Sequence, residues 1–248
     1  MFAQTSRKLL AQPTAGFDLE VFETRIREYA ATQSGALRIL EAGCGRRWYL
    51  DLEGIDFHLA GVDLNSDALR IRIEQAGDLD EAIVGDLREV TLQPEFYDVI
   101  YCSFVLEHVT GAEQVLDRLL AALKPGGMLL LRIPDGDSVY GFLARRSPFW
   151  LHVQYKRRIQ RNKLAGKPGR GPFPTVYDPV VSWRGITDYC ARYGVEVADA
   201  YSSNFYLDHF RGVATIADRG MQLVAKASRG RLTADHSNLS LVIRKPLP

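Results

Sequence analysis

The stretch that most constrains the fold is 37–45, which reads Leu-Arg-Ile-Leu-Glu-Ala-Gly-Cys-Gly. Its first half has the short, apolar character of a buried strand. Its second half places Gly43 and Gly45 where the strand must turn sharply, and a residue without a Cβ lets ligand atoms approach the backbone. Asp63 then closes a second strand-like run, 59–63. The pattern predicts an open α/β sheet with an adenosine-type cofactor across its strand tips, its ribose bound by Asp63.

Three further motifs follow along the chain. They are Gly85-Asp86-Leu87, the run Tyr97 to Cys102 that leads into Ser103-Phe104-Val105-Leu106-Glu107-His108-Val109, and Leu123-Lys124-Pro125-Gly126-Gly127 before an apolar strand. Together with the glycine pair and Asp63, these motifs resemble the class I S-adenosylmethionine-dependent methyltransferases. The resemblance covers residues 36–135, about the size of one domain core.

The resemblance implies a Rossmann-like, doubly wound α/β fold. We expect a seven-stranded, mainly parallel sheet with a C-terminal antiparallel hairpin and an inserted basic lid. The expected divisions are a loose arm and a cap helix at 1–35, the cofactor-binding core at 36–135, a basic aromatic insertion at 136–180, and the rest of the same sheet domain at 181–248.

The implied cofactor is S-adenosyl-L-methionine, which leaves as S-adenosyl-L-homocysteine. The expected cofactor-binding residues are Glu41, Gly43, Gly45, Asp63, Leu64, Asp86, Leu87 and Ser103. Among them, Asp86 would accept from the adenine amine and Ser103 would lie near the methionine part, while Glu41 would support the loop. Asp86 has an alternative role as the cap of a turn.

The loop departs from the family pattern after Gly45, because Arg46-Arg47-Trp48 stands where a third glycine is common. Two cations beside a helix N-terminus would attract the carboxylate of the cofactor, although either arginine can equally be solvated.

Methyl transfer needs a general base only if the acceptor must lose a proton. His108 is the first candidate, because it follows the fourth strand and its ordinary pKa lies near neutrality. Asp135, at the end of the fifth strand, is the second. The alternative is that Glu107 and His108 cap or pack at the next helix. We expect no metal ion, since Phe104 stands where metal-binding relatives have a carboxylate.

Positive charge is concentrated in the insertion. The formal net charge of the chain is +1, yet no Asp or Glu occurs between Ser138 and Tyr177. The basic residues there are Arg145, Arg146, Lys156, Arg157, Arg158, Arg161, Lys163, Lys167 and Arg170. With their aromatic neighbours they suit an anionic or lipid-linked acceptor, contact with an anionic membrane surface, or single-stranded nucleic acid, unless they form a solvated loop.

Two kinds of nucleic-acid methylation are disfavoured by the sequence after the fourth strand. Enzymes that methylate base amines carry an Asn/Asp-Pro-Pro-aromatic run there, and this chain has Ser103-Phe104-Val105-Leu106. Enzymes that methylate carbon five of cytosine use Pro-Cys or Thr-Cys, whereas Tyr101 precedes Cys102.

The sequence therefore predicts a methyltransferase that acts on an oxygen atom of a small-molecule, glycan or lipid-linked acceptor. The alternatives are an RNA-directed methyltransferase, a dinucleotide-dependent oxidoreductase and a non-catalytic interaction protein. The three cysteines lack metal-like spacing and indicate reduced thiols in the cytoplasm. We expect neither a signal peptide nor a membrane span, and the oligomeric state stays open.

Overall fold

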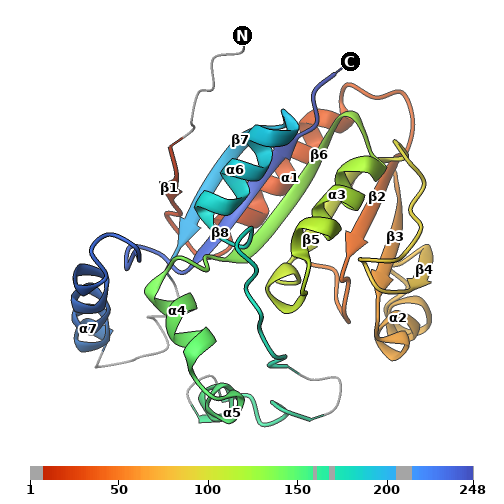
Figure 1. The fold of residues 1–248 in the computed structure, drawn as a ribbon. Coiled ribbons are helices and arrows are strands. Elements are labelled where there is room, and N and C mark those ends of the chain that lie inside the picture. The colour runs from red at the N-terminus through yellow and green to blue at the C-terminus, as the bar shows by residue number, and fades with distance from the viewer. Residues whose placement is uncertain (1–7, 159–160, 168–170, 205–213, 248) are drawn as a thin grey trace.

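The computed structural model describes residues 8–158, 161–167, 171–204 and 214–247. They form one eight-stranded sheet with the order β1-β7-β8-β6-β5-β2-β3-β4 (Figure 1). The strands are β1 (Leu10–Ala11), β2 (Leu37–Ala42), β3 (Phe57–Asp63), β4 (Glu81–Val84), β5 (Tyr97–Ser103), β6 (Leu123–Pro134), β7 (Glu196–Ser203) and β8 (Asn238–Arg244). β8 runs antiparallel to β6 and β7, and the other neighbours are parallel.

Strands β2 to β8 confirm the predicted mainly parallel sheet and its antiparallel C-terminal strands. β1 contradicts the prediction of a loose arm, because its two residues form a strand of the sheet. Leu10 and Ala11 pair with Tyr201 and Ser202 at the edge of the sheet, and the Gln12 amide donates to the Ser202 carbonyl at 2.8 Å. Two residues carry no periodicity, so this pairing had no sequence signal.

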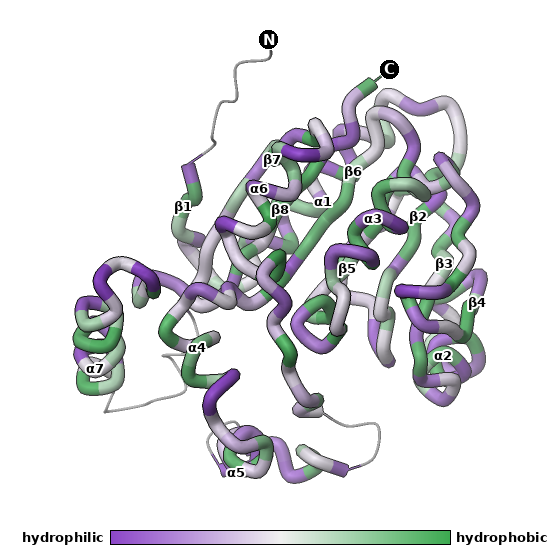
Figure 2. The backbone as a smooth tube through the Cα atoms, in the orientation of Figure 1, coloured by the Kyte–Doolittle hydropathy of each residue, from purple (hydrophilic) through white to green (hydrophobic). Residues whose placement is uncertain are grey.

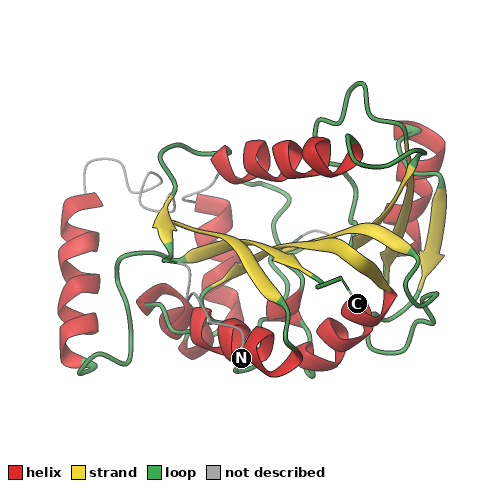
Figure 3. Ribbon diagram, turned by 90° about the horizontal axis from the view of Figure 1, so that it is seen from above, coloured by secondary structure: helices red, strands yellow, loops and turns green. Residues whose placement is uncertain are grey.

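Helices cover both faces of the sheet, as a doubly wound fold requires (Figure 3). They are α1 (Phe17–Ala30), α2 (Ser66–Ile71) with a π-turn η1 (Arg72–Ala76), the short 3₁₀ helix η2 (Leu106–His108), α3 (Ala112–Ala122), α4 (Val139–Arg146), α5 (Phe149–Arg158), α6 (Trp183–Tyr193) and α7 (Ala214–Ala227). Among the described helices, none is long and apolar enough to cross a membrane.

Two apolar cores form where helices pack on the strands. One contains α3 and α6, with Leu116 and Ile186 fully buried, and the other contains α1, with Phe22 and Ile26 fully buried. Figure 2 shows hydrophobic residues along the central strands as well as on the helices. Every residue of β5 except Ser103 is buried, which explains its continuous apolar run.

The parallel strands bring their carboxyl ends to one end of the sheet. Ala42 pairs with Val62 on one side and with Cys102 on the other, and Asp63 pairs with Val84. The loops that follow β2, β3, β4 and β5 therefore meet at this end. Chain order reverses beside β2, which is where ligands bind in open α/β sheets.

The insertion is bonded to this same end. The Asp178 carboxylate accepts from the Gly111 and Ala112 amides at 2.6 and 3.0 Å, at the start of α3. The Glu107 carbonyl of η2 accepts from the Val176 amide at 2.7 Å. We call residues 171–177 the strap, because they cross the loops at the strand ends. Arg170, one of the basic residues of the insertion, lies outside the described residues.

Candidate active site

A cavity of about 600 Å³ lies at the carboxyl ends of β2 to β5. Its lining residues are Gly43, Gly45, Arg46, Asp63, Leu64, Asn65, Ala68, Gly85, Asp86, Leu87, Arg88, Phe104, Val105, His108, Val109, Thr110, Gly171 and Phe173. The cavity thus brings together most of the residues that the sequence assigned to the cofactor, along with His108. Glu41, Ser103 and Asp135 are absent from the lining of this described cavity.

The glycine loop after β2 forms one wall. Gly43 has φ 73° and Gly45 has φ 55°, both in the left-handed region that glycine adopts without strain. A Cβ on Gly43 would collide with the side chain of Val105, so this position admits only glycine. A Cβ on Gly45 would meet no protein atom within 4 Å. The missing side chain at Gly45 therefore leaves room for a ligand against the backbone.

Asp63 joins this loop to the end of β3. One carboxylate oxygen accepts from the Gly45 amide and the other from the Asn65 amide, each at 2.8 Å. A carboxylate oxygen can accept more than one hydrogen bond, so both oxygens keep capacity for a pair of ribose hydroxyls. The next residue, Leu64, is 73% exposed and lines the cavity, which gives an apolar surface beside the carboxylate.

Glu41 supports the loop from behind. Its carboxylate accepts from Arg72 Nη1 at 2.8 Å, and the same nitrogen donates to the Cys44 carbonyl at 3.1 Å. Arg72 Nε donates to Asp78 at 2.6 Å. Arg72 is fully buried, so this guanidinium joins β2, the glycine loop and the turn after η1. Sequence reasoning missed Arg72, because nothing in an exposed-looking helical run marks one arginine as buried.

Asp86 lies at the cavity wall with its carboxylate already engaged. It accepts from the Arg88 amide at 2.8 Å and forms an ion pair with the Arg88 guanidinium at 2.6 Å. The side-chain hydrogen bond to Arg88 lowers the pKa of Asp86. The structure thus shows the turn contact that the sequence left as the alternative. The contact of Asp86 with adenine stays a prediction, and Leu87 lies beside it, buried against the core.

His108 lines the cavity at the end of η2. Its Nδ1 lies 2.8 Å from the Pro174 carbonyl of the strap, and its ring packs edge-on against Phe173 at 5.8 Å between centroids. A carbonyl oxygen only accepts, so Nδ1 carries the proton and Nε2 of the neutral ring keeps its lone pair. Burial lowers the pKa of His108, which keeps the ring neutral at pH 7. This state is the one that a general base requires.

Glu107, next to His108, is a buried carboxyl. It is 5% exposed, and its Oε2 has no hydrogen-bond partner among the described residues. Its Oε1 lies 3.7 Å from His108 Nε2. Burial raises the pKa of Glu107 to about 8. Lys156 of α5 interacts electrostatically with Glu107, and burial lowers the pKa of Lys156.

Asp135 does not reach the cavity, contrary to the expectation that it faces the cofactor. It is buried, and its Oδ2 lies 2.7 Å from Nε2 of His236. Its Oδ1 accepts from the Asp137 amide at 2.8 Å. The chain turns directly after β6, and both carboxylate oxygens are hydrogen-bonded to residues at or near that turn. We therefore assign Asp135 no catalytic role.

Ser103 also lies outside the cavity lining, and Phe104 takes its place. Phe104 adopts φ 54°, a conformation that is rare for an aromatic residue. Its ring lies 5.0 Å from the Arg132 guanidinium. The unusual backbone turns the chain at the end of β5, and the side chains of Phe104 and Val105, which follow Ser103, line the cavity. No local sequence pattern marks this turn.

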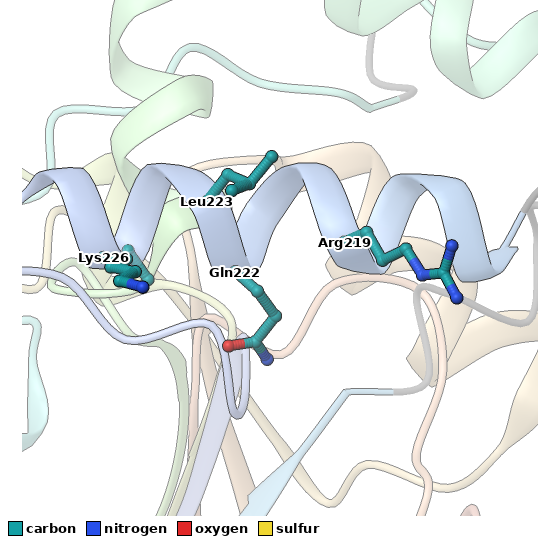
Figure 4. A pocket seen from close by; sticks show the side chains of 5 residues that line it. Arg219, Gln222, Leu223 and Lys226 are labelled. Carbon is teal, nitrogen blue, oxygen red and sulfur yellow. The ribbon is translucent and has the colours of Figure 1, made fainter.

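The part of the chain that the structure describes contains no cluster of three or more His, Cys, Asp or Glu side chains suited to a metal ion. A second surface depression lies along α7, lined by Arg219, Gln222, Leu223, Ala225 and Lys226 (Figure 4). All five residues belong to one helix, and no other described element contributes to the lining. The cavity at the strand ends is therefore the candidate active site.

Residues 15–198 match the family described as "Methyltransferase domain". The chain is 27% identical over 142 residues to the ubiquinone biosynthesis O-methyltransferase of Paraburkholderia phytofirmans. The matched region covers 51% of this chain and 60% of that protein. It is 35% identical over 107 residues to the trans-aconitate 2-methyltransferase of Variovorax paradoxus, covering 40% of this chain and 39% of that protein. The chain thus spans about half the length of the curated relatives it matches.

The fold has a counterpart in an S-adenosylmethionine-dependent methyltransferase from Mesorhizobium loti. The two structures superpose with a TM-score of 0.55 at 16% identity, covering 94% of this chain and 98% of that one. At this identity the likeness concerns the fold alone. The family match spans most of the chain and includes the glycine loop, Asp63 and η2. The chain therefore belongs to the class I S-adenosylmethionine-dependent methyltransferase family.

Proposed function

We propose that the protein transfers a methyl group from S-adenosylmethionine to an oxygen atom of a small-molecule acceptor, which can be glycan- or lipid-linked. The observation that carries this proposal is one cavity lined by the glycine loop, by Asp63 and by a neutral histidine. The first two suit an adenosyl group, and the third suits an acceptor that must lose a proton.

The residues of this cavity fit the cofactor. Gly45 leaves space against the backbone, Asp63 offers two carboxylate oxygens, and Leu64 presents an apolar side chain. When bound, S-adenosylmethionine supplies an electrophilic methyl carbon. Asp63 would bind the ribose hydroxyls, and Glu41 would act through Arg72 by holding the loop in shape.

His108 would remove the proton from the acceptor hydroxyl at Nε2. The deprotonated acceptor oxygen would then be able to accept the methyl group that the bound cofactor supplies. The hydrogen bond of Nδ1 to the Pro174 carbonyl orients the ring and stabilises the imidazolium that results. The strap, held to η2 by the Val176 amide, would exclude water from the cavity.

Two observations support a small, oxygen-bearing acceptor. The relatives named above are a ubiquinone biosynthesis O-methyltransferase and a trans-aconitate 2-methyltransferase, so both are named for small molecules. Arg46 and Arg88 line the cavity, and the charge of Arg88 is paired with that of Asp86, so Arg46 is the lining arginine outside this ion pair. Its charge favours an acceptor that carries a negative group.

Calorimetric titration tests the cofactor part of the proposal. We expect heat on titrating S-adenosylmethionine and S-adenosylhomocysteine, and none on titrating NAD. Heat on titrating NAD alone would instead indicate a dinucleotide-dependent enzyme. No heat with any of the three compounds would indicate a non-catalytic protein.

Transfer of labelled methyl groups tests the reaction. The protein and methyl-labelled S-adenosylmethionine are incubated with small-molecule, lipid and RNA fractions of a cell extract, and the labelled product is identified. We expect a methyl ether or methyl ester in the small-molecule or lipid fraction. Label found in RNA, or on carbon or nitrogen, would refute the proposed acceptor.

A further inference from the structure

One face of α5 is exposed and combines apolar with basic side chains. None of the described residues of α5 is buried. Trp150 is 62% exposed and Leu151 is 40% exposed, and Arg157 and Arg158 are exposed as well. Residues seven apart lie on the same side of a helix, so the two arginines continue the line of the two apolar residues. We call these four residues the outer face of α5.

The opposite side of α5 is attached to the rest of the insertion. His152 Nε2 lies 2.7 Å from Ser147 Oγ and 3.1 Å from the Ala144 carbonyl. Arg157, a member of the outer face, also donates from its Nε to the Ala165 carbonyl at 2.9 Å. These contacts hold the helix in one orientation. The outer face is therefore presented outward by the fold.

The corner between α4 and α5 extends this surface. Leu143 and Phe149 are exposed, and Arg146 lies between them in the chain. Residues 138–177 contain no acidic side chain, so no neighbour within that stretch neutralises its cations. Figure 1 shows α5 at an extremity of the molecule, away from the sheet. The surface is thus projecting, apolar at its centre and positively charged.

We propose that the outer face of α5 and the α4–α5 corner dock onto an anionic lipid bilayer. Trp150, Leu151 and Phe149 would enter the boundary between headgroups and acyl chains, where an indole and aliphatic groups are favoured. Arg146 and Arg158 would contact the negative headgroups. The inference stands apart from the proposed reaction, because it uses none of the residues that line the cavity.

Two other partners fit this surface less well. A second copy of the chain packed through the same face would bring like charges together, with no acidic residue between 138 and 177 to balance them. Single-stranded RNA is bound in grooves by stacking on aromatic rings, whereas Trp150 and Phe149 lie here on a projecting helix beside exposed leucines that have no ring to stack on. Apolar insertion beside cations is the chemistry of a lipid surface.

Co-sedimentation of the full-length protein with vesicles tests the proposal. One vesicle is phosphatidylcholine alone, and the other contains about one third phosphatidylglycerol. We expect binding to the anionic vesicle that weakens as salt is raised, and little binding to the neutral one. Equal binding to both, or no binding to either, would overturn the proposal.

Tryptophan fluorescence locates the contact. Trp48 and Trp183 are half-buried, so Trp150 is the exposed member of the three tryptophans. Anionic vesicles should shift the emission to the blue and shield it from an aqueous quencher. The W150F variant should lose this change while it still sediments with the vesicles. A spectrum of the wild type that vesicles leave unchanged would contradict insertion.

Variants separate insertion from charge. W150S/L151S and R146Q/R158Q should each weaken binding to anionic vesicles by about tenfold or more. The matched control R118Q/R192Q removes the same charge from exposed arginines of α3 and α6 and should bind like the wild type. All variants should keep their affinity for S-adenosylmethionine, which verifies folding. Equal weakening in the control would refute a local surface.

The same variants detect the other two partners. Salt-dependent binding of an oligouridine RNA that W150S/L151S abolishes, without vesicle binding, would assign the surface to nucleic acid. A dimer in sedimentation velocity that the same variant dissolves, again without vesicle binding, would assign it to self-association.

Discussion

At the scale of single residues, two carboxylates at the ends of neighbouring strands have different surroundings. Asp63 is the last residue of β3, and Asp86 comes two residues after the end of β4. Asp63 accepts from backbone amides only, at Gly45 and Asn65, whereas Asp86 is paired with the guanidinium of Arg88. A ligand can bind Asp63 without displacing a charged partner. Asp63 should therefore contribute more to cofactor affinity.

Replacing Asp63 by Ala should weaken S-adenosylmethionine binding by about 1–3 kcal/mol, because hydrogen bonds to a charged group are lost. Calorimetric titration measures the change. The control is D67A, since the Asp67 side chain is 70% exposed, one turn further along the chain. An unchanged affinity in D63A would remove this carboxylate from the cofactor site.

His108 should set the acid limb of the pH-rate profile. Its pKa is lowered from 6.5 by burial, so the base is neutral and competent at pH 7 and is lost by protonation only at more acidic pH. The rate should be flat near neutrality and fall below pH 6.5. H108Q should slow turnover by about a hundredfold or more and abolish that fall. The exposed His58 offers the control H58Q, and an acid limb that survives in H108Q would exclude this base.

At the scale of elements, a buried guanidinium holds the loop between β2 and β3 to the end of α2. Arg72 bonds to Glu41, Cys44 and Asp78, which belong to three separate segments. The loop itself contains three glycines with positive φ, at 43, 45 and 54, and no helical turn of its own. Its shape therefore depends on a contact made from behind.

Removing the charge of Arg72 alone should destabilise the protein more than removing the charges of Arg72 and Glu41 together. R72M leaves Glu41 buried and unpaired, which should lower the free energy of unfolding by about 3–5 kcal/mol in urea titration. In E41Q/R72M the loss should be smaller, because no buried charge remains. R70M alters an exposed ion pair two residues away and should change stability by about 0.5 kcal/mol or less. A double variant as unstable as R72M would show that packing, and not charge, is what matters.

At the scale of the whole molecule, the insertion and the sheet form a shared buried region around Glu107. The strap bonds to its carbonyl and to His108, and Asp178 bonds to the start of α3. These contacts cover the Glu107 side chain, which is 5% exposed. A carboxyl without a charged hydrogen-bond partner then favours its neutral form.

Stability should consequently fall as the pH rises. The pKa of Glu107 is about 8 in the folded protein against an ordinary 4.5, so the folded state holds this proton more tightly. Its contribution is complete below pH 4.5 and is lost as the pH rises to 8, with a slope of up to about 1.4 kcal/mol per pH unit. E107Q should remove that slope from urea titrations at pH 5 to 8. The exposed Glu53 provides the control E53Q, and an identical slope in E107Q would contradict this account.

The strands, the cap of α2 and the glycine loop could be predicted because each follows from local chemistry. Asn65 caps α2 and Gly77 ends the turn after it, at φ 64°, and asparagine and glycine are residue types that favour these two positions. β5 is buried along its apolar run. These features need only side-chain periodicity and backbone preference, which neighbouring residues determine.

The surroundings of the site residues could not be predicted in the same way. Whether Asp135 faces a cofactor depends on His236, a residue far along the chain, and whether Phe104 replaces Ser103 in the cavity depends on a backbone angle at the strand end. The sequence by itself determined which segments form strands, where the chain turns beneath a ligand and to which family the protein belongs. The tertiary structure alone decided which charges are buried, paired or open to a ligand, because burial and pairing come from segments that meet only when the chain has folded.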